Sequence, residues 1–155
     1  MGMREELCIT DGITSVIGSG GKTTLLALLA CELEGRVVLA TTMHILPFPG
    51  IPTVERLPLP ARVSCVASRG ESPKLGAPGE DFAALAEAAR YVLVEADGSK
   101  MLPIKAHAAY EPVIPADSNQ TILVVGASGF GKPVRKVVHR PDIFCSLTGC
   151  AAYDA

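Results

Sequence analysis

One stretch near the N-terminus limits the folds open to this chain more than any other feature. An apolar strand candidate at residues 12–17 leads directly into a glycine-rich turn, and an apolar helical pattern follows at residues 22–34. The turn consists of Gly18, Ser19, Gly20, Gly21, Lys22, Thr23 and Thr24. Glycines permit positive φ angles and close backbone approach, and amide groups at a helix N-terminus attract anions. The stretch therefore predicts a phosphate-binding loop between a buried strand and a helix.

The side chains of this loop fit a nucleoside triphosphate with Mg²⁺. Lys22 can neutralise the β and γ phosphates, and the Thr23 hydroxyl can ligate the metal. The usual spacing G-x-x-x-x-G-K-[ST] is not met, because Val16 stands where its first glycine belongs. We expect ATP, with GTP as the alternative, since no Asn-Lys-x-Asp stretch that reads guanine is present. A glycine-rich turn with an incidental lysine is the competing interpretation.

A second glycine-rich stretch, residues 126–132, fits the long spacing better on paper and also follows a strand candidate. Pro133 stands where the magnesium-binding hydroxyl belongs, and proline removes one of the amide donors that a phosphate loop uses. We expect a flexible loop near the nucleotide or the substrate, from which Lys132 could reach an anion.

Two carboxylates, Glu95 and Asp97, stand at the end of the apolar strand candidate at residues 91–95 and just after it. Because side chains alternate along an extended chain, Glu95 and Asp97 can face the same side. One could hold Mg²⁺, and the other could orient the attacking water or a substrate hydroxyl. Thr42, after another strand, could also contact the metal, since ligands bind at the carboxyl ends of parallel strands. The predicted catalytic residues are Lys22, Glu95 and Asp97, and the predicted metal ligands are Thr23, Glu95 and Thr42. Capping of the following turns is the alternative role for these acids and threonines.

Apolar strands alternate with helical patterns along the chain. Strands are expected at residues 12–17, 36–40, 63–67, 91–95 and 121–125, and helices at 22–34, 80–89 and from about Pro141. Proline-rich residues 46–60 and residues 68–79 are expected to be irregular. This order predicts a single α/β domain over residues 1–155, P-loop NTPase-like, with a mostly parallel sheet and helices on both faces. Whether the domain ends near residue 155 or continues into a C-terminal part stays open.

Composition excludes several classes of partner. A formal net charge of −2 and an aromatic content of 5% provide neither the charge nor the stacking surface that nucleic acid requires. No apolar run approaches the roughly 18 residues of a membrane span. The five cysteines are odd in number and contain no C-x-x-C pair, so we expect a reducing cytoplasm.

Several motifs resemble the YqeC family, described as accessory proteins of selenium-dependent molybdenum hydroxylases. They are Thr41-Thr42-x-His44, the block from Val94 to Lys100, the block from Leu102 to Ala106, Glu111 to Pro115, Gly131-Lys132-Pro133, and His139-Arg140-Pro141. The resemblance covers residues 15–142. Met101 and His107 depart from it, since a basic residue and a proline are expected there. It implies a phosphate-loop protein that acts in maturation of a molybdenum hydroxylase, with the molybdenum cofactor, the hydroxylase or its maturation proteins as partners, and a longer chain.

Three functions are consistent with these motifs. The first is an NTPase whose hydrolysis drives a maturation step. The second is a phosphotransferase or ligase that acts on a small molecule, for which the similar short loop of the Mur ligases is a parallel. The third is a binding module that uses nucleotide as a regulatory ligand without hydrolysis.

Overall fold

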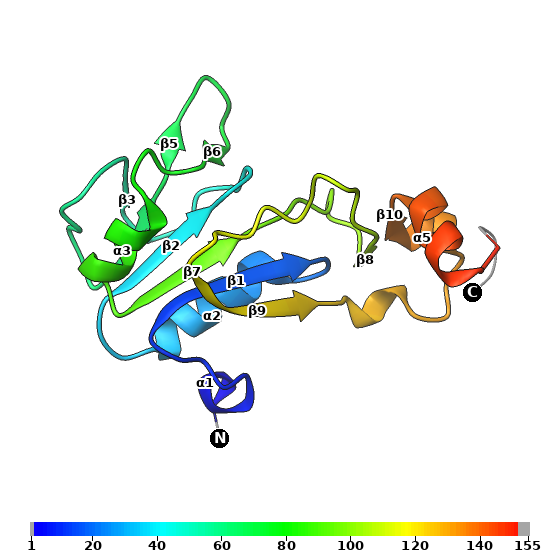
Figure 1. The fold of residues 1–155 in the computed structure, drawn as a ribbon, viewed down its shortest axis with the longest axis horizontal. Helices are drawn as coiled ribbons and strands as arrows, with labels where there is room; N and C mark the ends of the chain where they lie inside the picture. The colour runs from blue at the N-terminus through cyan, green and yellow to red at the C-terminus, as the bar shows by residue number, and fades with distance from the viewer. Residues whose placement is uncertain (1, 152–155) are drawn as a thin grey trace.

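A computed structural model describes residues 2–151 and has at its centre a six-stranded, wholly parallel sheet (Figure 1). The strands occur in the order β3-β4-β2-β7-β1-β9. Their bounds are β1 (Gly12–Gly18), β2 (Val37–Thr41), β3 (Thr53–Val54), β4 (Val63–Val66), β7 (Tyr91–Glu95) and β9 (Ser118–Val124). The expected α/β fold with a parallel sheet is confirmed.

Helices cover both faces of this sheet, also as expected. Every residue of β2 and β7 is buried, as their near-continuous Val and Leu content predicts for central strands of a parallel sheet. On one face α2 (Lys22–Glu32) contributes Leu26 and Leu29 to the larger apolar core. On the other face α3 (Phe82–Ala88) contributes Leu85 to a second core. The two central strands are thereby held rigid, which fixes the loops at their carboxyl ends.

A separate arm extends beyond the ends toward which the central strands point (Figure 1). It carries β8 (Ile104–Lys105), η1 (Ala127–Gly129), α4 (Val134–Val137), β10 (Val138–His139) and α5 (Pro141–Thr148). β8 pairs in parallel with β10, and Val134, Val137 and Val138 form a small core of their own. The arm thus places residues 134–141 opposite the turn that follows β1.

Local expectations were partly wrong. Residues 46–60 contain β3, which pairs with β4, and residues 68–79 contain the antiparallel pair β5 (Ser68–Arg69) and β6 (Leu75–Gly76). α2 ends at Glu32, because Leu33 is already extended, and β9 starts three residues before the predicted strand. The short α1 (Met3–Glu6) and the elements of the arm other than α5 had no local signal strong enough to predict them. Of the predicted domain 1–155, residues 1 and 152–155 lie outside the described part.

Within residues 2–151, every helix is too short or too polar to cross a bilayer.

Candidate functional site

The turn between β1 and α2 adopts a backbone that only glycine allows at low cost. Gly18, Gly20 and Gly21 have φ angles of +93°, +82° and +134°. A Cβ atom at Gly20 would lie 2.6 Å from the Cα atom of Gly126, so this glycine is also required by packing. A Cβ atom at Gly21 would meet no atom within 4 Å. The loop therefore packs closely against Gly126 at Gly20, whereas the space beside Gly21 is free of protein atoms.

Lys22 is the first residue of α2, and its side chain is only 4% exposed. Its ammonium donates a hydrogen bond to the Gly18 carbonyl at 2.7 Å. It also lies 3.0 Å from Asp97 Oδ1 and 3.8 Å from Glu95 Oε1. The positive charge is thus held at the loop by two carboxylates that come from the end of β7.

Glu95 is the last residue of β7 and reaches the first turn of α2. Thr23 Oγ1 donates a hydrogen bond to Glu95 Oε2 at 3.0 Å. Burial raises the pKa of Glu95 above its usual value, and the Lys22 ammonium and the Thr23 hydroxyl offset only part of that rise. Thr23 and Glu95 both line the cleft described below, so this hydroxyl–carboxylate pair is open to a ligand.

Asp97 has a different environment, although it comes only two residues later. Its carboxylate accepts a hydrogen bond from the Gly18 amide at 2.8 Å and lies 2.6 Å from His107 Nε2. Burial alone would raise the pKa of Asp97, but the bonds from Gly18, His107 and Lys22 outweigh burial and lower it. The Asp97 side chain is fully buried, and it holds the phosphate loop in place through its hydrogen bond with the Gly18 amide.

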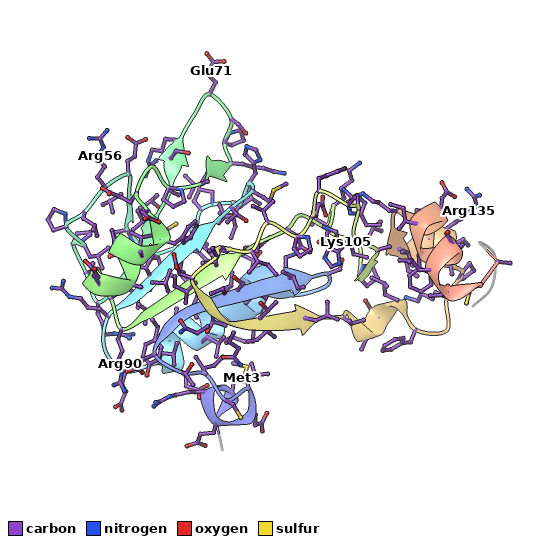
Figure 2. All side chains as sticks on the ribbon, viewed as in Figure 1. Met3, Arg56, Glu71, Arg90, Lys105 and Arg135 are labelled. Carbon is purple, nitrogen blue, oxygen red and sulfur yellow. The ribbon has the colours of Figure 1, made fainter. Side chains whose placement is uncertain are left out.

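A chain of ion pairs continues from Asp97 into the arm. The buried Lys105 ammonium lies 3.3 Å from Asp97 Oδ2 and also pairs with Glu111. Arg140, at the start of α5, donates to both Glu111 oxygens, at 2.8 Å and 2.6 Å. Hydrogen bonds from Arg140 and Lys105 lower the pKa of Glu111 to about 2, against the effect of burial. Figure 2 shows Lys105 between the sheet and the arm, where it ties the two together.

A large cleft of about 1220 Å³ opens between the loop and the arm. It lies at the carboxyl ends of the parallel strands, where open α/β sheets bind their ligands. The residues that line it on the loop side are Gly20, Gly21, Lys22, Thr23, Thr24 and Glu95. Most of the predicted site residues are therefore brought to one surface.

The remaining predicted residues take other positions. The Thr42 hydroxyl donates to the Val113 carbonyl at 2.7 Å, and Thr42 does not line the cleft. Ser19 is buried, and its hydroxyl donates to the Leu102 carbonyl. Arg140, which stood within a block of family resemblance, pairs with the buried carboxylate of Glu111.

The second glycine-rich stretch lies behind the phosphate loop. The Gly126 amide donates to the Pro103 carbonyl at 2.7 Å, beside Gly20. Lys132 lines a separate cavity of about 260 Å³ between η1 and α5. It therefore lies outside the large cleft.

Sequence reasoning missed the roles of three residues in this site. Lys105 and Glu111 stood only within blocks of family resemblance, and His107 stood out only as a departure from that resemblance. Their partners are 6 to 29 positions away, as in the pairs Lys105–Glu111 and Arg140–Glu111. Side-chain contacts between residues so far apart leave no periodic pattern in the sequence.

Among residues 2–151, no three His, Cys, Asp or Glu side chains lie close enough together to hold a metal ion by themselves.

Comparison with known proteins identifies the family. The family model described as YqeC protein matches residues 14–142. The uncharacterized protein YqeC of Escherichia coli strain K12 is 33% identical to this chain, in an alignment that covers 88% of this chain and 60% of that protein. No solved structure matches the chain. The chain belongs to the YqeC family, and it spans about three fifths of the length of this curated relative.

Proposed function

We propose, from its membership of the YqeC family and from its loop, that this protein binds Mg²⁺ and a nucleoside triphosphate, ATP rather than GTP, and hydrolyses it. One observation carries the proposal. The Lys22 ammonium and the Thr23–Glu95 pair lie side by side at the head of α2, on a glycine loop that opens into the large cleft.

The loop fits a polyphosphate chain. Three glycines with positive φ turn the backbone before α2, whose N-terminal amides favour negative charge. Open space at Gly21 leaves room for phosphate oxygens. Lys22 already lies at the loop, so its ammonium would meet a phosphate after a side-chain rotation that exchanges its contacts with the Gly18 carbonyl and Asp97 for phosphate oxygens. A hydrogen bond from a charged group contributes roughly 1.5–3 kcal/mol, so Lys22 would add to the affinity by an amount of this order.

The Thr23–Glu95 pair fits Mg²⁺. In phosphate-loop NTPases the metal is held by the loop hydroxyl and by a carboxylate from a neighbouring strand end. Bound Mg²⁺ supplies charge neutralisation at the β and γ phosphate oxygens. Thr23 and Glu95 would hold it directly or through water, whereas Thr42 does not line the cleft.

Glu95 and Asp97 have different roles in the proposed site. Glu95 faces the cleft, so besides holding Mg²⁺ it could orient a water molecule on the metal toward phosphate. Asp97 contacts Gly18 and Lys22 beneath the loop, so it acts as a positioning residue.

The family resemblance extends the proposal to a cellular role. We place the protein among the maturation factors of a selenium-dependent molybdenum hydroxylase, with hydrolysis driving a step on the enzyme or on its cofactor. Cells that lack the protein would regain hydroxylase activity with the native chain but not with Lys22→Ala. Equal rescue by both chains would refute this role while leaving nucleotide binding intact.

Release of phosphate from ATP and from GTP tests the activity directly. Native protein should release phosphate only when Mg²⁺ is present, and Lys22→Ala should abolish the release. The matched control is Lys132→Ala in the second glycine-rich stretch, which does not line the cleft and should leave the rate unchanged. Release that survives Lys22→Ala, or that is lost with Lys132→Ala alone, contradicts the proposal.

A further inference from the structure

The cleft carries a charge opposite to that of the chain as a whole. Its lining includes five lysines and arginines but only two acids, Glu95 and Glu111. The complete chain has a formal net charge of −2, so this excess of cations is a local feature and not a background property. A local positive field in a cleft concentrates anions there.

Most of these cations stand away from the phosphate loop. Lys74 comes from the turn between β5 and β6, Lys100 from the segment after β7, Arg135 from α4, and Arg140 from the start of α5. We call these four residues the distal wall. They belong to four separate segments that converge on one cleft, and Figure 2 places Arg135 on the arm, away from the sheet. Lys22 is the only cation of the lining that belongs to the loop itself.

Acids nearby cancel only part of the charge of the distal wall, since Arg135 lies 3.8 Å from Asp142 and Arg140 is paired with Glu111. Glu111 is shared by Arg140 and the buried Lys105, and Lys105 also pairs with Asp97. Neither the Lys74 nor the Lys100 ammonium has an ion-pair partner among residues 2–151. Lys100 and the next residue also adopt positive φ angles of 49° and 61°, a costly backbone for residues other than glycine. Backbone strain of this kind is concentrated at functional sites.

His139, which also lines the cleft, responds to this field. Burial lowers its pKa, and the charges of Arg140, Lys105 and Lys100 lower it further. The arm side of the cleft is thus electropositive even where its own histidine is neutral.

The size of the cleft leaves room for a second molecule. Its volume of about 1220 Å³ exceeds the roughly 300–1,000 Å³ of pockets that hold one small ligand. A nucleotide anchored at Lys22 would occupy the loop side and leave the part of the cleft lined by Lys74 and Lys100 open to a second anion.

We propose that the distal wall binds a second substrate, a small anion that carries phosphate or carboxylate groups, beside the nucleotide in the same cleft. This inference rests on the proposed function, because the nucleotide site defines the other half of the cleft. It gives the phosphotransferase or ligase alternative a physical basis, since an acceptor held there would share one cleft with the nucleotide.

Calorimetric titration with two simple anions tests the proposal. Protein saturated with Mg²⁺ and a nonhydrolysable ATP analogue is titrated with inorganic phosphate and, separately, with succinate. One further saturable site should appear for at least one anion, and the stronger of the two identifies the group that the substrate carries. The double variant Lys74→Gln with Lys100→Gln should weaken this site roughly tenfold, as expected for losing two exposed charge contacts.

A matched control removes the same charge elsewhere. The double variant Lys132→Gln with Lys136→Gln changes two exposed lysines that do not line the cleft, and it should leave the site unchanged. Equal weakening by both double variants would mean nonspecific attraction and would overturn the inference. So would the absence of saturable binding of either anion.

A second arm separates this inference from the nucleotide proposal. In Lys22→Ala protein without nucleotide, the distal wall should still bind the anion, and the binding should still depend on Lys74 and Lys100. If the analogue fails to bind native protein but this dependence persists, the nucleotide proposal fails and the distal site stands. If the analogue binds and the anion does not, only the distal site fails.

Discussion

Asp97→Asn is the substitution that probes the site most sharply. The aspartate carboxylate faces two buried ammonium groups, Lys22 at 3.0 Å and Lys105 at 3.3 Å, and also accepts the Gly18 amide. Asparagine has the same shape and can still accept the amide bond, so the change removes charge with little change in packing. Both lysines would then be left with less compensation in a water-poor environment.

The expected loss follows from burial. Removing one partner of a buried ion pair costs about 3–5 kcal/mol. Lys22 keeps Glu95 at 3.8 Å and Lys105 keeps Glu111, so we expect the lower end, about 3 kcal/mol. Because the pKa of Asp97 is lowered by folding from 3.8, its contribution is present above that pH and lost as pH falls further, so the difference should be measured near pH 7.

Urea unfolding followed by far-ultraviolet circular dichroism provides the measurement, since the chain has no tryptophan to report by fluorescence. Asp11→Asn is the control. Asp11 pairs with Arg90 at 2.9 Å, but its side chain is 61% exposed, so its loss should cost less than about 1 kcal/mol. If Asp97→Asn costs no more than Asp11→Asn, the buried network does not hold the loop and the reasoning is refuted.

Four further outcomes follow from the same structure. Glu95→Gln should leave the urea midpoint unchanged or raise it, because a carboxylate whose pKa is raised by folding costs stability when it is ionised at neutral pH. Phosphate release by the same variant should fall roughly 100-fold. A large drop in the urea midpoint would contradict this. Gly20→Ala should destabilise more than Gly21→Ala in the same urea assay, since both have positive φ but only the Cβ at Gly20 meets backbone, at 2.6 Å. Glu111→Gln should reduce the loss of stability between pH 4.5 and about 2. Ionised Glu111 stabilises the native protein above the pKa of the unfolded state, and this stabilisation is lost as the pH falls through the pKa of the folded state. An unchanged dependence of stability on acid pH would count against the ion pairs of the arm. Cys65, whose pKa burial raises to about 11, should resist iodoacetamide at pH 8, where roughly one thiol in a thousand would be ionised, and its early labelling in a mass spectrum would show that the core opens.

The centre of the fold was predictable because its signals are local. The strand before Gly18, the glycines and the helix after Lys22 follow one another directly in sequence. β7 was predicted with its observed bounds, since four residues that favour strands, Tyr91 to Val94, are followed by the carboxylate of Glu95. Parallel strands then place the end of β7 beside the end of β1 without any further information.

The arm was not predictable for the opposite reason. Its ion pairs join residues that are distant in sequence, such as Arg140 with Glu111. β8 and β10 are two residues each, too short for a periodic pattern. Sequence reasoning also treated Glu95 and Asp97 as interchangeable carboxylates, whereas their burial and partners make one face the cleft and the other lie beneath the loop.

The most direct test of the central claim is the heat of binding when Mg²⁺ and a nonhydrolysable ATP analogue are titrated into the native protein. We predict one saturable site that disappears in Lys22→Ala and persists in Lys132→Ala, with both variants folded by circular dichroism. Absence of any heat with a triphosphate at millimolar concentration, from folded native protein, would show that residues 18–24 do not form a nucleotide site.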